Sequence, residues 1–285
     1  MAIKRHVKRK AHAEEMIPSV RMPESSSLTN MILSLAIILV IILVYSIYVT
    51  TSIGQPPKVD KPDLTVTYIL DSKCTDCADI SALTQFLEQY GNVDTKSVEF
   101  DSSAGKKLIS KYSIEKVPSA VVTGDLSKVP DLKTKWNQFG LVSADALVLL
   151  NTPSPYLNIT SGNVQGLVEI TYLADKSCTE CYNPLLHKQA LASLGITKFS
   201  KETSVDVSSD EGKALVSKYK IKAAPTIILS SGAAEYPGLV QVWPSVGTIE
   251  SDGSFVFRTM SAIKGVSYKD LTTGEVVGTK NATAP

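Results

Sequence analysis

The chain has 285 residues, enough for two modest domains, and its 44% hydrophobic and 20% charged residues are the composition of an ordinary globular protein. Its formal net charge of +1 gives no global reason to expect a nucleic acid as a partner. The charge is unevenly distributed, because residues 1–30 carry six lysines and arginines against three glutamates. This basic tail is the first predicted segment of the chain.

A long apolar segment follows the basic tail. Met31–Val49 has 19 residues without a charge, and as a helix it would reach roughly 28 Å, about the thickness of a hydrocarbon core. Tyr45 and Tyr48 lie near its end, where aromatic side chains favour the membrane interface. The positive-inside rule then predicts a single-pass protein of the cell membrane, with its N-terminus in the cytoplasm and residues 50–285 outside.

Two other interpretations of this segment stay open. A cleavable signal peptide would have a shorter apolar core and a small-residue cleavage site, and the following TTSIGQPP offers no good Ala-x-Ala. A buried helix of a soluble protein would show a polar face, which this segment lacks. The sequence favours an uncleaved anchor, followed by a linker at residues 50–63 that Pro56, Pro57 and Pro62 stiffen.

The rest of the chain contains an internal duplication. Residues 67–77 (TYILDSKCTDC) align with 171–181 (TYLADKSCTEC) at an offset of 104, and residues 105–112 (GKKLISKY) align with 212–219 (GKALVSKY) at an offset of 107. Pairs that keep the second offset are Pro118/Pro225, Pro130/Pro237 and Trp136/Trp243. The three extra residues fall after the second cysteine, where a first helix and its loop would absorb them.

The duplication predicts two domains, at residues 64–166 and 167–285, which are called the first and second repeat below. Each has a β-rich run, a Cys-x-x-Cys pair, a helix, a strand, a helix, a proline and further strands. The first helix is expected over Ala78–Tyr90 and over Leu185–Leu194. Because strand–helix–strand crossovers are right-handed, the first two strands should lie side by side and parallel. The last strands should add an antiparallel pair at the sheet edge.

This layout resembles the thioredoxin fold, in which Cys-x-x-Cys begins the first main helix and a proline opens the next antiparallel strand. The resemblance covers nearly all of residues 64–278. The tandem arrangement is similar to the two-domain protein disulfide oxidoreductases of archaea. The expected membrane anchor and extracytoplasmic location depart from that group and resemble, in role, membrane-tethered Dsb-like or disulfide-isomerase-like proteins. The expected fold class is therefore α/β, with two tandem thioredoxin-like domains after one N-terminal transmembrane helix. The resemblance implies an oxidoreductase or isomerase that exchanges thiols and disulfides on protein substrates without a cofactor.

The four cysteines are the candidate catalytic residues, because a thiolate attacks a disulfide and the pKa of the thiol must fall from about 8.5. A helix N-terminus lowers it with unpaired amide hydrogens and about half a positive charge. The spacing leaves Cys74 or Cys178 at the exposed end of the predicted helix, as the nucleophile. Cys77 or Cys181 would lie about one turn further in and resolve the mixed disulfide.

The resemblance also assigns substrate-binding residues. In thioredoxin-like proteins the proline is cis and faces the cysteine pair, and the residue before it offers backbone hydrogen bonds to an extended substrate. The matching positions are Val117 and Pro118 in the first repeat, and Ala224 and Pro225 in the second.

Two features depart from the familiar pattern: the dipeptides inside the pairs are Thr75-Asp76 and Thr179-Glu180, and Lys73 and Ser177 rather than tryptophan precede the pairs. Asp76 and Glu180 lie inside the cysteine pairs, and a carboxylate there opposes the thiolate, which predicts a reducing or intermediate potential. Lys73 would offset part of this in the first repeat only. Tyr68 and Tyr172 occupy the position, six before the first cysteine, where thioredoxin has a buried acid that assists proton transfer.

Other interpretations of the cysteines stay open. They could form inert disulfides on a non-catalytic binding or assembly scaffold, although a bridge across so short a loop stabilises little. A shared zinc site would span about 100 residues between pairs, against the usual 15–20. Cu(I) suits paired thiolates, and the extra ligands beyond the membrane segment are His187 and Met260. His187 is more simply a surface or packing residue.

The remaining expectations concern packing and partners. Trp136 and Trp243 recur at the same offset, which predicts a packing role set by the fold. The expected partners are protein thiols and disulfides, a redox partner that regenerates the sites, and the membrane through one helix. No metal is expected, and no nucleic acid.

Overall fold

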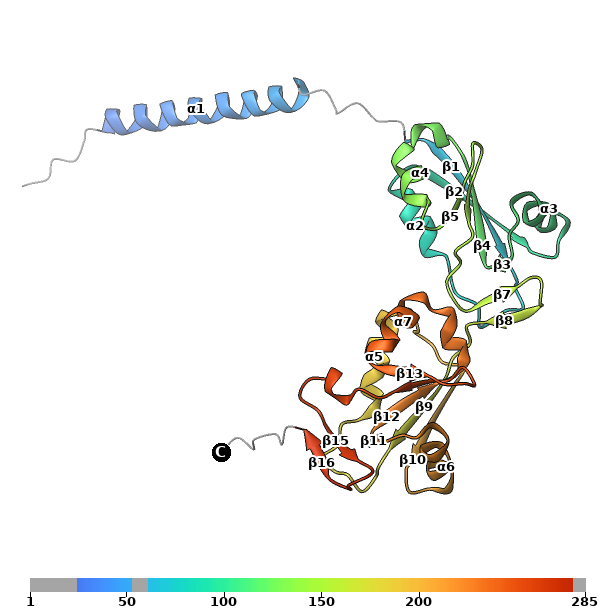
Figure 1. Cartoon of the computed structure of the whole chain (residues 1–285). Helices are drawn as coiled ribbons and strands as arrows, with labels where there is room; N and C mark the ends of the chain where they lie inside the picture. Colours follow the sequence, from blue (N-terminus) through green and yellow to red (C-terminus); the bar gives the residue numbers. More distant parts are fainter. Residues whose placement is uncertain (1–24, 53–60, 279–285) are drawn as a thin grey trace, which may run out of the picture. The chain divides into compact units, whose positions relative to one another are not determined.

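The computed structural model describes residues 25–52 and 61–278 of the chain (Figure 1). The chain separates into two compact units, Met1–Asp60 and Lys61–Pro285. In the first, helix α1 (Ser25–Ser52) contains the segment Met31–Val49, which is long and apolar enough to cross a membrane. Residues 1–24 of the predicted basic tail and residues 53–60 of the predicted linker lie outside the described residues.

The first repeat contains a five-stranded sheet in the order β2-β1-β4-β6-β5. Its strands are β1 (Asp63–Leu70), β2 (Asn92–Glu99), β4 (Ser119–Gly124), β5 (Gly140–Val142) and β6 (Leu147–Leu149). Strands β1 and β2 are parallel, as predicted, and all other pairings are antiparallel. The predicted antiparallel edge pair is confirmed as β5 and β6.

The second repeat contains a sheet with the same order, β10-β9-β12-β14-β13. Its strands are β9 (Glu169–Ala174), β10 (Lys201–Asp206), β12 (Thr226–Leu229), β13 (Gly247–Ile249) and β14 (Phe255–Phe257). Strands β9 and β10 are parallel, and β13 and β14 form the antiparallel edge pair. The same backbone path therefore occurs twice.

Short helices connect these strands. In the first repeat they are α2 (Ala82–Glu88), α3 (Ser103–Tyr112), α4 (Pro130–Trp136) and the 3-10 turn η1 (Leu126–Lys128). In the second they are α5 (His187–Ser193), α6 (Asp210–Tyr219), α7 (Pro237–Val242), η2 (Pro184–Leu186), η3 (Ser231–Glu235), η4 (Trp243–Ser245) and η5 (Met260–Ala262). Proline starts α4 and α7, where its missing N–H costs no hydrogen bond.

The second main helix of each repeat begins in the same way. The hydroxyls of Ser102 and Ser209 cap α3 and α6 by accepting from the amides of Gly105 and Gly212. A Cβ at Gly105 would lie 2.1 Å from the carbonyl oxygen of Glu99, and Gly212 is equally confined. Glycine recurs there because the helix start presses against the end of the preceding strand.

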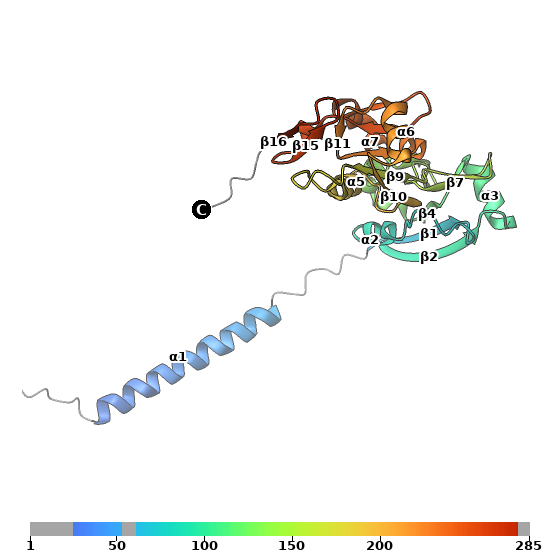
Figure 2. The ribbon, with the colours of Figure 1, turned by 90° about the horizontal axis from the view of Figure 1, so that it is seen from below.

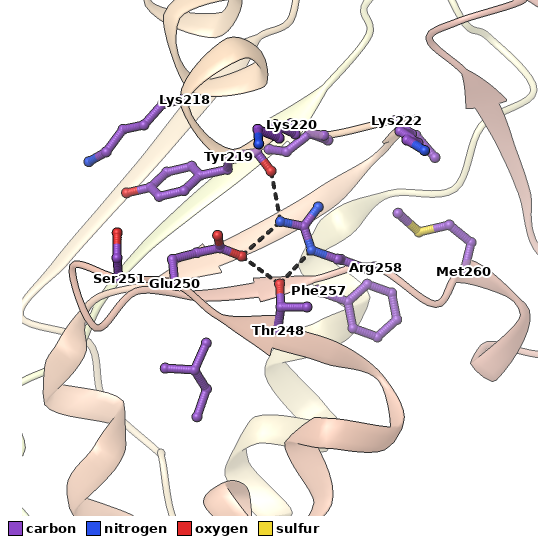
Figure 3. Close-up of a pocket in the computed structure, with 13 residues that line it drawn as sticks. Lys218, Tyr219, Lys220, Lys222, Thr248, Glu250, Ser251, Phe257, Arg258 and Met260 are labelled. Carbon is purple, nitrogen blue, oxygen red and sulfur yellow. Dashed lines mark hydrogen bonds and ion pairs between the residues drawn. The ribbon is translucent and has the colours of Figure 1, made fainter.

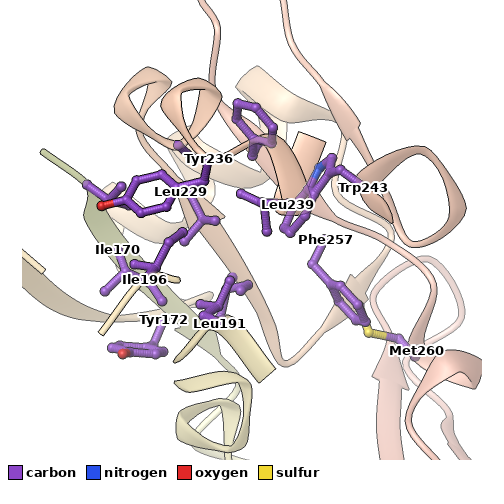
Figure 4. Close-up of a cluster of buried hydrophobic side chains, with 14 residues drawn as sticks. Ile170, Tyr172, Leu191, Ile196, Leu229, Tyr236, Leu239, Trp243, Phe257 and Met260 are labelled. Atoms are coloured by element: carbon purple, nitrogen blue, oxygen red, sulfur yellow. The ribbon is translucent and has the colours of Figure 1, made fainter. Parts of the chain in front are cut away.

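Both tryptophans are core residues. Trp136 is fully buried and its indole donates to the carbonyl of Val148 at 3.1 Å, while Trp243 donates to that of Thr248 at 3.1 Å. Figure 4 shows Trp243 beside Leu239 in the core of the second repeat. The predicted packing role is therefore confirmed.

Each repeat also carries a hairpin that the sequence interpretation assigned to no element. The first hairpin is β7 (Tyr156–Asn158) with β8 (Asn163–Gln165), and it pairs with the short strand β3 (Lys116–Val117). The second hairpin is β15 (Ser267–Asp270) with β16 (Val276–Gly278), and it pairs with β11 (Ala223–Ala224). Figure 2 shows β11, β15 and β16 side by side.

Candidate redox sites

Each cysteine pair lies in a turn that follows the first strand of its repeat. Cys74 is bonded to Cys77 and Cys178 to Cys181, with 5.4 Å between the Cα atoms in both pairs. The amide of Cys74 donates to the carbonyl of Asp71 at 3.0 Å, and Cys178 donates in the same way. All four cysteines are half-buried. The predicted pairs are therefore held as two local disulfides in equivalent turns.

The predicted position of the pairs at a helix start is wrong. Helix α2 begins at Ala82 rather than Ala78, and α5 begins at His187. Side chains compete with the helix for the intervening amides: Asp79 accepts from the amide of Ser81 at 2.8 Å, and this bond lowers the pKa of Asp79. In the second repeat Asn183 instead caps η2 by accepting from the amide of Leu185 at 3.0 Å, and η2 leads directly into α5, so the helical segment starts within one residue of the predicted Leu185. The helix N-terminus therefore does not supply the positive end expected beside the first cysteine.

The prolines meet the cysteines as the resemblance implied. The Val117–Pro118 and Ala224–Pro225 bonds are cis. The sulfur of Cys77 lies 3.9 Å from the carbonyl oxygen of Val117, and the sulfur of Cys181 lies 3.9 Å from that of Ala224. The structure thus brings Val117 and Ala224, each followed by its cis proline, to the second cysteine of their own pair.

The backbone before each cis proline is already paired with the chain itself. Val117 lies opposite Leu157 of β7, and the amide of Ile159 donates to the carbonyl of Glu115 at 2.9 Å. Hydrogen-bonded pairs alternate along an antiparallel ladder. Glu115 and Ile159 form one such pair, so Val117 and Leu157, which lie two residues along each strand, form the next.

The second repeat shows the same arrangement. Ala224 lies opposite Lys269 of β15, and the amide of Leu271 donates to the carbonyl of Lys222 at 2.8 Å. The predicted hydrogen bonds from Val117 and Ala224 to a substrate therefore require each hairpin to move.

Each hairpin also contacts the cysteine turn of its own repeat. The residue after the second cysteine donates its amide to the start of the hairpin strand: Ala78 to Pro155 at 2.7 Å, and Tyr182 to Ser267 at 2.9 Å. The hairpin strand thus joins the proline strand to the cysteine turn.

An ion pair ties the second hairpin to its cysteine turn. The ammonium of Lys269 lies 2.7 Å from Oδ2 of Asp175 and 3.2 Å from the hydroxyl of Ser177, the residue before Cys178. The bond from Lys269, and then that from Ser177, lowers the pKa of Asp175. Asp175 and Lys269 are 94 positions apart in the chain, so no local sequence pattern joins them.

The first site has an apolar residue at the matching position. Leu157, opposite Val117, is buried in a cluster against which Cys77 packs. The carboxylate of Asp71, the counterpart of Asp175, accepts only from the amide of Lys73, at 3.0 Å, among the described residues. The two sites therefore share a backbone and differ in the side chain that faces the cysteine turn.

Tyr182, next to Cys181, links the second site to its core. Its hydroxyl donates to the carbonyl of Pro225 at 2.9 Å and lies 3.0 Å from Nε2 of His187 and 3.7 Å from the sulfur of Met260. Burial raises the pKa of Tyr182 and lowers the pKa of His187 to about 4. His187 also packs edge-on against Phe257, with 4.5 Å between ring centroids. The packing interpretation of His187 is confirmed.

The tyrosines six residues before each pair are buried but bonded away from the cysteines. Tyr68 shares a 2.6 Å hydrogen bond with Thr84, and Tyr172 donates to Glu202 at 3.0 Å. Burial, and then Glu202, raises the pKa of Tyr172. The described hydrogen bonds of both hydroxyls therefore go to residues other than the cysteines.

A cavity of about 730 Å³ borders the second site (Figure 3). Its wall includes Ala223 of β11 and Met260, which contacts Tyr182. Arg258 crosses it, donating to the carbonyl of Tyr219 and to Glu250, each at 2.7 Å. The guanidinium thus caps the C-terminal end of α6. Across residues 25–52 and 61–278 no group of three or more His, Cys, Asp or Glu side chains is arranged to hold a metal ion.

Comparisons with known proteins leave the family open. No protein-family model and no curated protein matches the chain. Among solved structures, the NTD_N/C domain of alkylhydroperoxide reductase AhpF from Enterococcus faecalis is 16% identical, covering 59% of this chain and 82% of that one, with a TM-score of 0.17. A protein disulfide oxidoreductase from Aeropyrum pernix is 16% identical, covering 61% and 78%, with a TM-score of 0.17. These identities and TM-scores assign the chain to no family and give it no function. The chain's own two cysteine sites are therefore the basis for its function.

Proposed function

We propose that this chain is a thiol–disulfide oxidoreductase or isomerase that acts on protein substrates through its two Cys-x-x-Cys pairs. The observation that carries the proposal is the repeated contact of the second cysteine with the backbone before a cis proline, at 3.9 Å in both repeats. A disulfide that closes so short a loop stabilises little. Two such disulfides in equivalent turns therefore favour chemistry over scaffolding.

The exchange proceeds through a mixed disulfide. A substrate thiolate attacks the sulfur of Cys74 or Cys178, forms an S–S bond with it, and releases Cys77 or Cys181 as a thiolate that takes up a proton. The second substrate thiolate then attacks the substrate sulfur of the mixed disulfide. The substrate leaves oxidised to a disulfide, and the cysteine pair is left as two thiols. The reverse sequence reduces a substrate disulfide, and a redox partner restores the starting state.

The proposed location is the outer face of the cell membrane. Helix α1 contains one segment long and apolar enough to span a bilayer, and the six basic residues among residues 1–30 favour a cytoplasmic N-terminus. The two domains, residues 64–166 and 167–285, would then work outside the cytoplasm, where disulfides persist. Protein thiols and a regenerating partner would be met there.

The rival is a non-catalytic scaffold with idle disulfides. The hairpins favour it, because they fill the position of a substrate strand in both repeats. Copper handling has less support, because His187 is buried and already contacts Tyr182.

A redox titration of the full chain in detergent separates these functions. The chain is equilibrated in dithiol buffers, its thiols are trapped with an alkylating reagent that adds mass, and wild type is compared with Cys74→Ser and Cys178→Ser. Two reversible two-electron transitions above about −300 mV are expected, each lost in one variant. Pairs that stay oxidised at lower potentials would identify structural disulfides. A single transition that depends on added Cu(I) would identify metal handling.

A further inference from the structure

Lys269 is a side chain that the proposed function does not yet use. It lies on β15 opposite Ala224, and its ammonium crosses to the turn that leads into Cys178. There it donates to Asp175 at 2.7 Å and to the hydroxyl of Ser177 at 3.2 Å. A cation is therefore held beside the residue that precedes the attacking cysteine.

The ion pair is more sheltered than the others near the cysteines. The side chains of Lys269 and Asp175 are 24% and 9% exposed, whereas those of Lys198 and Asp76 are 69% and 48% exposed. Exposed pairs are weakened by water and salt, and sheltered pairs much less so. Asp175 also shapes the turn, because its carbonyl accepts from the amide of Cys178 at 3.0 Å. Displacement of Lys269 would therefore affect the Cys178 thiolate in two ways, by changing the nearby charge and by changing the turn that holds Cys178.

The first repeat supplies a natural counterpart. Leu157 takes the register position of Lys269, and Cys77 packs against the apolar cluster that contains it. An apolar surrounding disfavours a thiolate, and a nearby cation favours one. The pair with the better stabilised thiolate has the more stable reduced form and is the stronger oxidant.

We propose that Lys269 is a positioning residue of the second cysteine pair, which stabilises its reduced form through Asp175 and Ser177 and makes it the more oxidising of the two pairs. The inference rests on the proposed function. When both pairs are titrated with the same dithiol, the second pair is reduced first: its disulfide takes up two electrons and two protons from the dithiol and becomes two thiols. The first pair stays a disulfide until more reductant is supplied.

Other charges share the surroundings of Cys178, and the experiment must hold them fixed. They are Lys176 and Glu180 on the turn, Asp206 at the end of β10, which accepts from the amide of Lys176 at 3.0 Å, and Asp270 of β15. Substitutions confined to Lys269 and Asp175 leave this set unchanged.

The test uses the full chain in detergent with only the second pair present, in a Cys74→Ser, Cys77→Ser background. Two quantities are measured: the equilibrium with a dithiol buffer, and the pH dependence of Cys178 alkylation by iodoacetamide. Lys269→Leu is expected to move the alkylation profile up by about one pH unit. At a pH above both pKa values it should also shift the equilibrium about tenfold toward the disulfide, which corresponds to about 30 mV. Lys269→Arg should restore both values.

Asp175→Asn separates the charge effect from a structural one. It removes the carboxylate and leaves the cation, so the alkylation profile should move down, opposite to Lys269→Leu. Lys218→Leu, which removes a lysine paired with Asp252 at 2.7 Å, should change neither quantity. The inference is overturned if Lys269→Leu changes neither quantity, or if Lys269→Leu and Asp175→Asn move the profile in the same direction. A second pair that does not exchange at all, even with Lys269 intact, would instead contradict the proposed function.

Discussion

The two cysteine sites have the same backbone and different surroundings. In each, a disulfide turn meets the residue before a cis proline, and a hairpin strand lies across both. The residue at the centre of that strand is Leu157 in the first repeat and Lys269 in the second. The two repeats therefore share the geometry that presents the sulfurs and differ in the side chain beside the cysteine turn.

Burial decides which charges count in this comparison. Lys73, Asp76 and Lys198 near the first pair are exposed, so their fields are strongly screened. Asp175 near the second pair is sheltered and keeps most of its field. Counting charges would make the two sites nearly equal, whereas weighting them by exposure makes the second site the more strongly perturbed one.

The largest expected effect comes from the two cores. Trp136→Ala and Trp243→Ala each remove a buried indole and should lower the free energy of unfolding by about 3–5 kcal/mol. If the repeats fold independently, each substitution exposes only its own cysteine pair to alkylation at intermediate denaturant. Denaturant titration with mass detection of both pairs measures this. Exposure of both pairs together by either substitution would show that the repeats unfold as one unit.

The next effect concerns acid and falls on the second repeat. The pKa of His187 is lowered by burial to about 4, below the ordinary 6.5. The unfolded chain therefore binds the proton first, and stability is lost as pH falls from about 6.5 to about 4. The shift corresponds to a loss of about 3 kcal/mol across that window. Urea titrations from pH 7 to pH 4 measure it.

The first repeat provides the control for His187. Leu83 occupies the corresponding position, and it packs against the core. His187→Leu should remove most of the acid sensitivity of the second repeat and leave that of the first unchanged. Equal acid sensitivity in wild type and variant would show that carboxylates, rather than His187, control it.

Much of the scaffold could be predicted from the sequence. Alternation and β-branched residues located the sheet strands, and the repeated Gly105 and Gly212 located the second helices. The hairpins were also within reach, because Gly162 and Gly274 take positive φ in their turns and lie between β-rich runs. They also repeat in sequence, since residues 156–166 (YLNITSGNVQG) align with 268–278 (YKDLTTGEVVG) at an offset of 112.

Two features of the sites were beyond pattern reading. The first helix of the first repeat starts later than predicted because the side chain of Asp79 takes the amide of Ser81, a local balance that periodicity does not report. The contact of Lys269 with Asp175 joins residues far apart in the chain, and only the register of β11 with β15 brings them together. No local sequence pattern could therefore have predicted the Lys269–Asp175 ion pair beside the second cysteine pair.

The hairpins can be opened one at a time. Leu157→Pro removes the amide that pairs with Val117 as well as the buried side chain, and the lost hydrogen bond alone, about 1 kcal/mol, should favour the open strand about fivefold. The first pair should then react about fivefold faster with an extended peptide disulfide, while the second pair is unchanged. Stopped-flow exchange with the peptide and with a small dithiol measures the difference.

The control for this effect is Leu157→Ala, which keeps the amide and loses the buried side chain. It should accelerate the reaction with peptide less than Leu157→Pro does. An equal acceleration with the small dithiol would mean that the proline has loosened the whole site, and the hairpin would lose its role as a barrier to substrates.

The smallest effect comes from the carboxylates inside the pairs. Asp76 has a counter-ion, Lys198, at 3.1 Å, whereas Glu180 forms no ion pair with any residue in 25–52 or 61–278. A charge at about 6 Å in water is worth at most about half a pKa unit to a thiolate. Glu180→Gln should therefore accelerate alkylation of Cys178 at pH 7 slightly, and Asp76→Asn should accelerate that of Cys74 less.

Salt distinguishes this explanation from a change in turn geometry. At about 1 M salt the screening length falls to about 3 Å, so the advantage of Glu180→Gln should disappear while that of Lys269, which acts from a sheltered position, should persist. An effect of Glu180→Gln that survives high salt would mean that the side chain acts through the turn. The second site would then owe its difference to shape as well as to charge.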